Sequence, residues 1–237
     1  MTELGYRGNE EWTDMSNFVV HFTKGAIAPG GNGQPAMLSP ADVLWKILAE
    51  RLLKRGPDAW GAAVNLLELK DTQRSVCFSE IPLGYLSRLV ARRKSSYGIA
   101  FRKAFVFAKG GAPVWYVDRG SPVELLLSQM RREGLAHRPD YKTHAVWRIT
   151  PFTDHPFHGE GRQWRFEWER EWRVPLDVQF TDTDVAFLFL EEAVHASWRD
   201  AFTKLRASHG LSYPAKFIDP LWPWDRMVAE CKPLATS

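Results

Sequence analysis

The stretch FEWEREWRVP, residues 166–175, guides the interpretation of this chain because its side chains alternate with a period of two. Aromatic and apolar residues fall on one side of the alternation, together with Arg170, whereas three glutamates and Arg173 fall on the other. Strict alternation with aromatic enrichment is typical of a half-buried β-strand. Like charges on one strand face repel each other. The row of glutamates therefore indicates either a solvated strand face or carboxylates used in acid–base chemistry.

Length and composition indicate a folded protein with a full core. The chain has 237 residues, of which 45% are hydrophobic, and it contains 11 tryptophans. These values suit one large domain or two small ones. No apolar run approaches the ~20 residues that span a bilayer, and the polar, acidic N-terminus is unlike a signal peptide. Cys77 and Cys231 match no metal spacing. We therefore expect a cytoplasmic protein without membrane association, structural disulfide or bound metal.

The predicted elements alternate between strands and helices. Strands are expected at 17–23, 74–83, 144–150, 166–174 and 185–192, with two more around the Gly-Gly turn within 97–118. Helices are expected at 39–56, 83–94, 121–134 and 193–210. Hairpin-type links outnumber βαβ crossovers, which predicts an α+β fold with mostly antiparallel sheets. No linker divides the chain, so we expect a single domain over residues 1–237. Its motifs lie at about 17–192, followed by a C-terminal helix and a Pro- and Trp-rich tail at 193–237.

Positive charge is concentrated in the middle of the chain. No acidic residue occurs between Glu80 and Asp118. The basic residues that we predict to contact nucleic acid there are Arg88, Arg92, Arg93, Lys94, Arg102 and Lys103. A positive face of this kind attracts the phosphates of a dinucleotide or of a nucleic acid backbone. A solvated helix face explains the same residues equally well.

Isolated polar residues allow more than one interpretation. His21, inside the first predicted strand, is either a core histidine bonded to the backbone or an imidazole that orients a ligand hydroxyl. Ser79 closes a strand at a turn, where a hydroxyl is often only a cap. His155 and His158 have i, i+3 spacing, but a metal site would need further ligands from elsewhere. The chain has no nucleophile elbow, GxGxxG or Walker loop.

Five short motifs, taken in their order along the chain, resemble the AbiGi-type abortive-infection proteins of bacterial phage defence. They are HFT (21–23), VCFSEIPL (76–83), YGIAF (97–101), PVWY (113–116) and EREWRV (169–174). The same order of His, Ser and Glu motifs is similar to the ADP-ribosyltransferase fold, particularly the DarT-like enzymes that modify nucleic acid. The resemblance implies a split core of two antiparallel sheets that grip NAD between them.

The resemblance also implies a role for each motif residue. Glu171 would be the catalytic carboxylate, and Glu169 would help to activate the acceptor. His21 would hydrogen-bond the adenosine ribose of NAD, while the backbone at Phe22 meets the nicotinamide amide. The other residues implied in binding NAD are Thr23, Ser79, Tyr97 and Arg173. The chain departs from the DarT pattern because its glutamate lies in EREWRV rather than in an RQAE context, which leaves the acceptor open.

The chemistry of NAD cleavage fits a carboxylate row. Breaking the nicotinamide–ribose bond creates an oxocarbenium-like centre, which a fixed carboxylate stabilises in the transition state. A second carboxylate, about 7 Å along the same strand face, can deprotonate the incoming nucleophile. Arg173 would hold Glu171 ionised or meet a phosphate.

Four functions remain open at this stage. The first is an NAD-dependent ADP-ribosyltransferase that acts on DNA, RNA or protein in phage defence or a toxin–antitoxin system. The second is an NAD glycohydrolase on the same fold, in which water replaces the acceptor. The third is a catalytically inactive binding protein, such as an antitoxin or sensor, with a cognate defence partner. The fourth is a metal-dependent nuclease that uses the loop around His155 and His158.

Overall fold

The protein forms two compact units in the computed structural model. The structure describes residues 16–29, 35–57, 67–80, 85–137, 140–155, 157–159, 162–164, 169–209 and 212–231. Unit 1 comprises Met1–Leu53, Phe78–Phe105 and Gln179–Ser237, and unit 2 comprises Lys54–Cys77 and Val106–Val178. The single domain expected from the sequence stays a prediction.

Helices and strands occur in both units. Unit 1 contains β1 (Phe18–Phe22), β2 (Ala26–Pro29), β3 (Pro35–Leu38), α1 (Pro40–Glu50), β4 (Leu52–Leu53), α2 (Leu86–Arg93), β6 (Gly98–Arg102), β14 (Val185–Phe189), α6 (His195–His209), β15 (Lys216–Ile218) and α7 (Trp224–Cys231). Unit 2 contains β7 (Ala112–Pro113), β8 (Trp115–Tyr116), α4 (Pro122–Ala136), α5 (Val146–Ile149), β9 (Thr153–Asp154), β10 (Phe157–Gly159), β11 (Arg162–Trp164) and β12 (Glu171–Val174). Three of the four unit boundaries fall inside β5 (Val76–Ser79), α3 (Lys103–Ala108) and β13 (Val178–Gln179), and the fourth directly follows β4.

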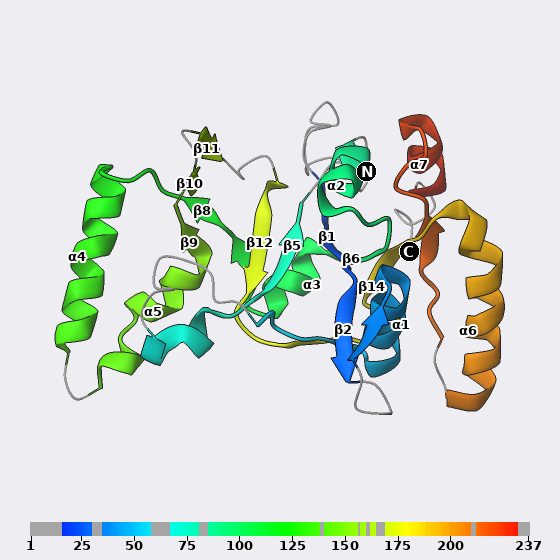
Figure 1. Cartoon of the computed structure of the whole chain (residues 1–237), viewed down its shortest axis with the longest axis horizontal. Coiled ribbons are helices and arrows are strands. Elements are labelled where there is room, and N and C mark those ends of the chain that lie inside the picture. The colour runs from blue at the N-terminus through cyan, green and yellow to red at the C-terminus, as the bar shows by residue number, and fades with distance from the viewer. Residues whose placement is uncertain are drawn as a thin grey trace. The chain divides into compact units, whose positions relative to one another are not determined.

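The main sheet of unit 1 has the strand order β15-β14-β6-β1-β5 (Figure 1). Neighbouring strands are antiparallel, apart from β14 and β15, which run parallel. The register places Val20 of β1 opposite both Ala100 of β6 and Ser79 of β5. A mixed sheet accompanied by helices confirms the α+β fold class that the sequence predicts.

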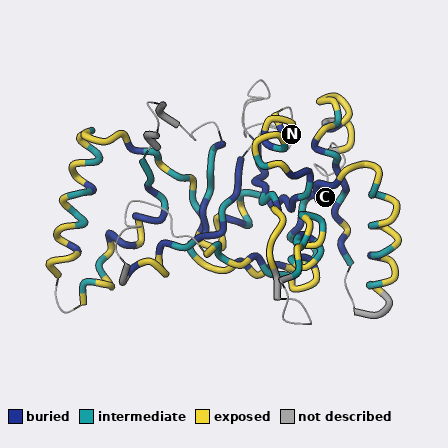
Figure 2. Tube along the Cα trace, viewed as in Figure 1, coloured by how far each residue is buried: buried dark blue, intermediate teal, exposed yellow. Residues whose placement is uncertain are grey.

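The sequence of β1, FVVHF, explains its central place in this sheet. Phe18 and Val20 lie on one face, in a core cluster with Leu86 and Leu89 of α2. Val19, which has the opposite orientation, is also buried. A strand that is apolar on both faces requires cover on both sides, and Figure 2 shows the central strands β1, β6 and β14 as largely buried. The strands expected at 17–23 and 185–192 are confirmed as β1 and β14.

Helix α1 begins where the sequence predicts and ends earlier. Ser39 and Asp42 form a capping box, and Pro40 occupies the first turn. The helix ends at Glu50 rather than near Gly56, because Arg51 adopts the left-handed conformation with φ 51°. The Arg51 Nε donates to Asp182 Oδ1 at 2.6 Å, so a tertiary contact holds this helix end.

Two other predictions differ from the structure. The two strands expected around the Gly-Gly turn within 97–118 are found in part, because β6 precedes the turn and β7 and β8 follow it. However, α3 lies between β6 and the turn, and its Phe105 ring stacks on Phe101 at 4.9 Å. The strand expected at 144–150 is the short helix α5. There Val146 and Trp147 are buried against Leu69. Short apolar runs suit a strand or a buried helix equally, and packing decided both cases.

We predict that Gly111→Ala destabilises unit 2. A Cβ at Gly111 would lie 2.6 Å from Val106 Cγ1, 2.8 Å from the Val106 carbonyl oxygen and 2.9 Å from Val174 Cγ2. Overpacking of this kind costs about 1–3 kcal/mol, measurable by urea denaturation. Gly56→Ala is the matched control, because its nearest atom would be the Ser75 oxygen at 4.0 Å. It should change the free energy of unfolding by no more than about 0.5 kcal/mol. Equal effects of the two changes would contradict the prediction.

Candidate functional site

Strand β12 carries the glutamate that the motif order singles out. It pairs antiparallel with β7, where Arg173 lies opposite Ala112. The Val114 amide donates to the Glu171 carbonyl at 2.7 Å. The strand order places β5 on the other side of β12, and Cys77 at the start of β5 belongs to unit 2. The Cys77 thiol hydrogen-bonds to the Glu171 carboxylate. Glu171 therefore begins a strand that has neighbours on both sides.

The Arg173 guanidinium is the buried centre of this site. Its side chain is 2% exposed. Its Nε donates to Glu171 Oε1 at 2.9 Å, its Nη2 to Asp154 Oδ2 at 2.8 Å, and its Nη1 to the Pro151 carbonyl at 3.1 Å. Burial alone would lower the pKa of Arg173, but Glu171 and Asp154 raise it above the ordinary value. Arg173 is therefore a permanent cation held by two carboxylates.

Glu171 is ionised at neutral pH and held in one orientation. Its Oε2 accepts from the Tyr116 hydroxyl at 2.7 Å and from Arg173 Nη2 at 3.1 Å. Burial opposes the charged form, but the Arg173 guanidinium and the Tyr116 hydrogen bond bring the pKa of Glu171 below its usual value. Burial and the Glu171 carboxylate raise the pKa of Tyr116, which therefore stays a donor. The Glu171 side chain is 14% exposed, so the carboxylate is not fully enclosed.

This geometry supplies an oriented anion whose charge is largely balanced by Arg173. Such a carboxylate can stabilise a developing positive charge, and it equally serves to neutralise a buried arginine. The hydrogen bonds from Arg173 to Glu171 are those expected of a residue that keeps the Glu171 carboxylate ionised. Binding of NAD by Arg173 stays a prediction. Sequence reasoning did not find Tyr116 and Asp154 as partners, because only the tertiary fold brings these residues to the site.

The opening stretch of sequence differs from the expected strand. Residues 165–168 lie outside the described part, and the strand begins only at Glu171. Arg170 has φ 43°, a left-handed conformation that interrupts extended structure before Glu171. The expected continuous strand is therefore wrong at Glu169 and Arg170. Glu169 is 4% exposed and precedes β12, so the expected row of both carboxylates along one strand face does not form. Its action on an acceptor stays a prediction.

Thr23 ties three segments of unit 1 together. Its side chain hydroxyl donates to the Pro40 carbonyl at 2.7 Å and to the Tyr97 carbonyl at 3.2 Å. Its backbone amide also donates to the Tyr97 carbonyl, at 2.9 Å. Thr23 is 1% exposed, so its hydroxyl is buried and stabilises the fold through these backbone hydrogen bonds. The Phe22 ring stacks on Phe189 at 5.9 Å and packs on the core.

The remaining motif residues of unit 1 lie on or beside adjoining strands. His21 on β1 is half-buried, and its ring meets Phe78 edge-on at 5.9 Å. Ser79, at the end of β5, is buried opposite Val20 of β1. The half-buried Tyr97, just before β6, has its ring 6.4 Å from Trp198. Contact of these residues with NAD stays a prediction.

The basic residues predicted to bind nucleic acid fall into two groups. Arg88, Arg92 and Lys94 are exposed on or just after α2, and Arg93 is half-buried. Arg102 and Lys103 are half-buried: the Arg102 guanidinium lies 5.7 Å from the centre of the Phe18 ring, and Lys103 Nζ pairs with buried Glu80 at 2.6 Å. The first group presents charge to solvent, whereas the Lys103 charge is used within the protein. Arg92 and Arg93 also lie in the last turn of α2, where their positive charges interact favourably with the negative end of the helix dipole.

Of the two histidines in the loop that was considered for a metal site, only His155 has a described side chain. The His155 Nδ1 lies 2.9 Å from the Val117 carbonyl oxygen, and the side chain of His158 is outside the described part. No group of three or more His, Cys, Asp or Glu residues suited to a metal ion occurs in the described ranges. In the same ranges, none of the helices is both long enough and apolar enough to cross a bilayer.

We predict that Glu171→Gln destabilises the protein in a pH-dependent way. Because the folded-state pKa of Glu171 is lowered, its ionised form stabilises the fold above the ordinary glutamate pKa of 4.5. That contribution is lost as the pH falls through the lowered value. At pH 7 the change should cost about 3 kcal/mol, since it removes one partner of a buried ion pair. The difference from the wild type should shrink on acidification in urea denaturation series.

The control for this experiment is Glu133→Gln on the exposed side of α4. A surface change of this kind should alter the free energy of unfolding by about 0.5 kcal/mol or less at every pH. A constant difference between Glu171→Gln and the wild type across the acid range would contradict the assigned ionisation of Glu171.

Comparison with known proteins identifies the family. Residues 65–216 match the family model described as "Putative abortive phage resistance protein AbiGi, antitoxin". The search of curated proteins gave no match, and neither did the search of solved structures. The matched region covers more than half of the chain and includes Ser79, the basic helix α2 and the Glu171–Arg173 pair. The chain therefore belongs to the AbiGi family of abortive phage resistance proteins.

Proposed function

We propose that this protein acts in phage defence as an NAD-dependent ADP-ribosyltransferase with Glu171 as its catalytic carboxylate. Family membership supports the defence role. The observation that carries the activity is the geometry at Glu171 within unit 2. The side chain is 14% exposed, and Arg173 and Tyr116 hold its two carboxylate oxygens by hydrogen bonds of 2.9 and 2.7 Å. Glu171 begins β12, in the motif that the resemblance marks as catalytic.

The state of Glu171 supports this role. A carboxylate that stabilises an oxocarbenium-like centre has to be ionised and fixed before the reaction. Arg173 and Tyr116 supply both conditions, because they lower the pKa of Glu171 and orient both of its oxygens. NAD would be the substrate that donates ADP-ribose, and nucleic acid is the proposed acceptor because of the exposed basic residues of α2.

A second candidate is an antitoxin that acts by binding without catalysis. The specific observation in its favour is the same ion pair, because a carboxylate neutralised by a buried arginine has little charge left for a substrate. The family description, which contains the word antitoxin, agrees with a cognate partner. An NAD glycohydrolase would use Glu171 in the same way, with water as the acceptor.

We predict that purified protein releases nicotinamide from NAD and that Glu171→Gln lowers this rate about 10²–10³-fold. The change keeps the shape of the side chain and removes its charge. Asp154→Asn is the matched variant, because it disturbs the same Arg173 guanidinium without touching Glu171. It should lower the rate less than about tenfold if Glu171 acts on NAD, since it leaves the electrostatic group in place. Glu133→Gln serves as the surface control.

Label transfer from NAD to nucleic acid or protein separates the candidates. Nicotinamide release without transfer would favour the glycohydrolase, and the absence of both would favour the non-catalytic antitoxin. If Glu169 activates the acceptor, Glu169→Gln lowers transfer and leaves nicotinamide release unchanged. A folded, fully active Glu171→Gln variant would overturn the catalytic assignment.

We predict that binding to nucleic acid through α2 weakens steeply with salt. Each phosphate contact should contribute roughly one unit to the slope of log affinity against log salt. Replacing Arg92, Arg93 and Lys94 together by glutamate should reduce both affinity and slope, as measured by fluorescence anisotropy of a labelled oligonucleotide. Binding that ignores salt, or that survives the triple change, would indicate that these residues form only a solvated helix face.

A further inference from the structure

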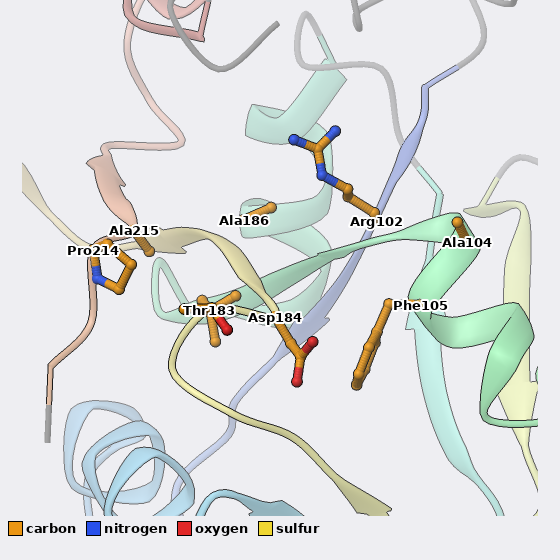
Figure 3. Close-up of a pocket in the computed structure, with 9 residues that line it drawn as sticks. Arg102, Ala104, Phe105, Thr183, Asp184, Ala186, Pro214 and Ala215 are labelled. Atoms are coloured by element: carbon orange, nitrogen blue, oxygen red, sulfur yellow. The ribbon is translucent and has the colours of Figure 1, made fainter. Parts of the chain in front are cut away.

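A pocket in unit 1 lies beyond the last paired residues of β6 and β14, Phe101 and Val185 (Figure 3). Its volume is about 330 Å³. Volumes of this size lie within the range of small-molecule sites in proteins. None of the motif residues lines this pocket apart from Arg102, which belongs to the predicted basic set. The pocket is therefore separate in composition from the Glu171 cluster.

The local strand geometry opens this space. The register between β14 and β6 shifts between Val185 and Phe187, so Ala186 is an additional residue on β14 and lines the pocket. Such bulges bend a strand, re-aim its side chains and occur often beside binding sites. On its other edge, β14 pairs with β15 only from Phe187 onward. The segment before Phe187 is thus available as the wall of a pocket.

The pocket carries opposite charges at different places. In Figure 3 the side chain of Arg102 extends in one direction, and Asp184 extends in another, beside the Phe105 ring. Asp184 is fixed in place, because its Oδ2 accepts from the Thr181 amide and from the Thr181 hydroxyl, both at 2.7 Å. A ligand that binds both side chains needs an anionic group for Arg102 and, some distance away, a group with N–H donors for Asp184.

The aromatic lining selects among such ligands. Phe105 lines the pocket while its ring stacks on Phe101 with an interplanar angle of 16°. A ring held in this way offers a fixed apolar surface against which a planar base can lie. Arginine is well suited to phosphate because its planar guanidinium donates several hydrogen bonds. We propose that this pocket binds a nucleotide, with the phosphate at Arg102, the base beside Phe105 and the base N–H groups toward Asp184.

The surroundings favour a nucleotide within a single strand over a free one. The Arg102 guanidinium lies over Phe18, and Phe18 belongs to the core cluster that includes Leu86 and Leu89 of α2. The Arg102 guanidinium and α2 therefore lie on one face of the sheet, whereas Phe105 packs on Phe101 on the other face, so the proposed nucleotide passes around the end of β6. The exposed basic residues of α2 supply sites for further phosphates, which a mononucleotide does not have.

The test is direct binding to the full chain without NAD. The probes are AMP, GMP, CMP and UMP in calorimetry, and a fluorescein-labelled single-stranded DNA of about 12 nucleotides in anisotropy. Arg102→Gln should weaken binding about ten- to hundredfold, because it removes a charge-assisted hydrogen bond to phosphate. Ala104→Trp should weaken binding by filling the pocket from an exposed lining position. It keeps the test valid if Arg102→Gln does not fold.

Two matched controls on α6 complete the design. Arg206→Gln and Ala196→Trp make the same chemical changes at exposed positions outside the pocket lining, and both should leave affinity unchanged. Binding of the oligonucleotide alone supports a nucleotide within a strand, and binding of a mononucleotide supports a free nucleotide. Absence of binding by every probe, or equal weakening by pocket and control variants, would overturn the proposal. Because NAD is absent, this outcome is independent of the proposed transferase activity.

Discussion

The buried guanidinium of Arg173 is the constraint around which the described part of unit 2 is organised. A cation with a 2% exposed side chain is costly unless carboxylates and carbonyls surround it. Asp154 on β9, Glu171 on β12 and the Pro151 carbonyl supply those partners. Strand β9 pairs with β8, whose Tyr116 completes the shell of Glu171. Short strands that would be weak alone are thus held together by one shared cation.

The same constraint makes structure and chemistry hard to separate at Glu171. A catalytic carboxylate requires fixed orientation and ionisation, and a counter-ion of a buried arginine requires the same two properties. The difference lies in what remains accessible: the Glu171 side chain is 14% exposed, whereas Arg173 is almost fully enclosed. This arrangement suits charge stabilisation in the transition state better than proton transfer, because the arginine holds the pKa of Glu171 low.

Local sequence patterns predicted the elements whose periodicity agrees with their packing. Strands β1 and β14 and the starts of α1 and α4 follow from apolar patterns and serine caps. The failures occurred where a tertiary contact decides the conformation. Arg51 ends α1 because Asp182 holds its side chain, and no local pattern contains that information. Glutamate alternation before β12 suggested a longer strand, but the left-handed Arg170 interrupts it. Likewise, the motif order indicated Glu171, whereas its partners Tyr116 and Asp154 needed the fold.

Burial and pairing, rather than residue type, determine which charges are available to another molecule. Lys103 belongs to the basic segment by sequence, but its ammonium group neutralises buried Glu80. Arg88 and Lys94 come from the same segment and are exposed. An exposed arginine keeps its hydration and contributes mainly through long-range attraction of phosphates, while a half-buried one such as Arg102 would, in our proposal, meet a ligand at short range. A surface that attracts a strand and a pocket that holds one of its nucleotides therefore need different arginines, and unit 1 contains both kinds.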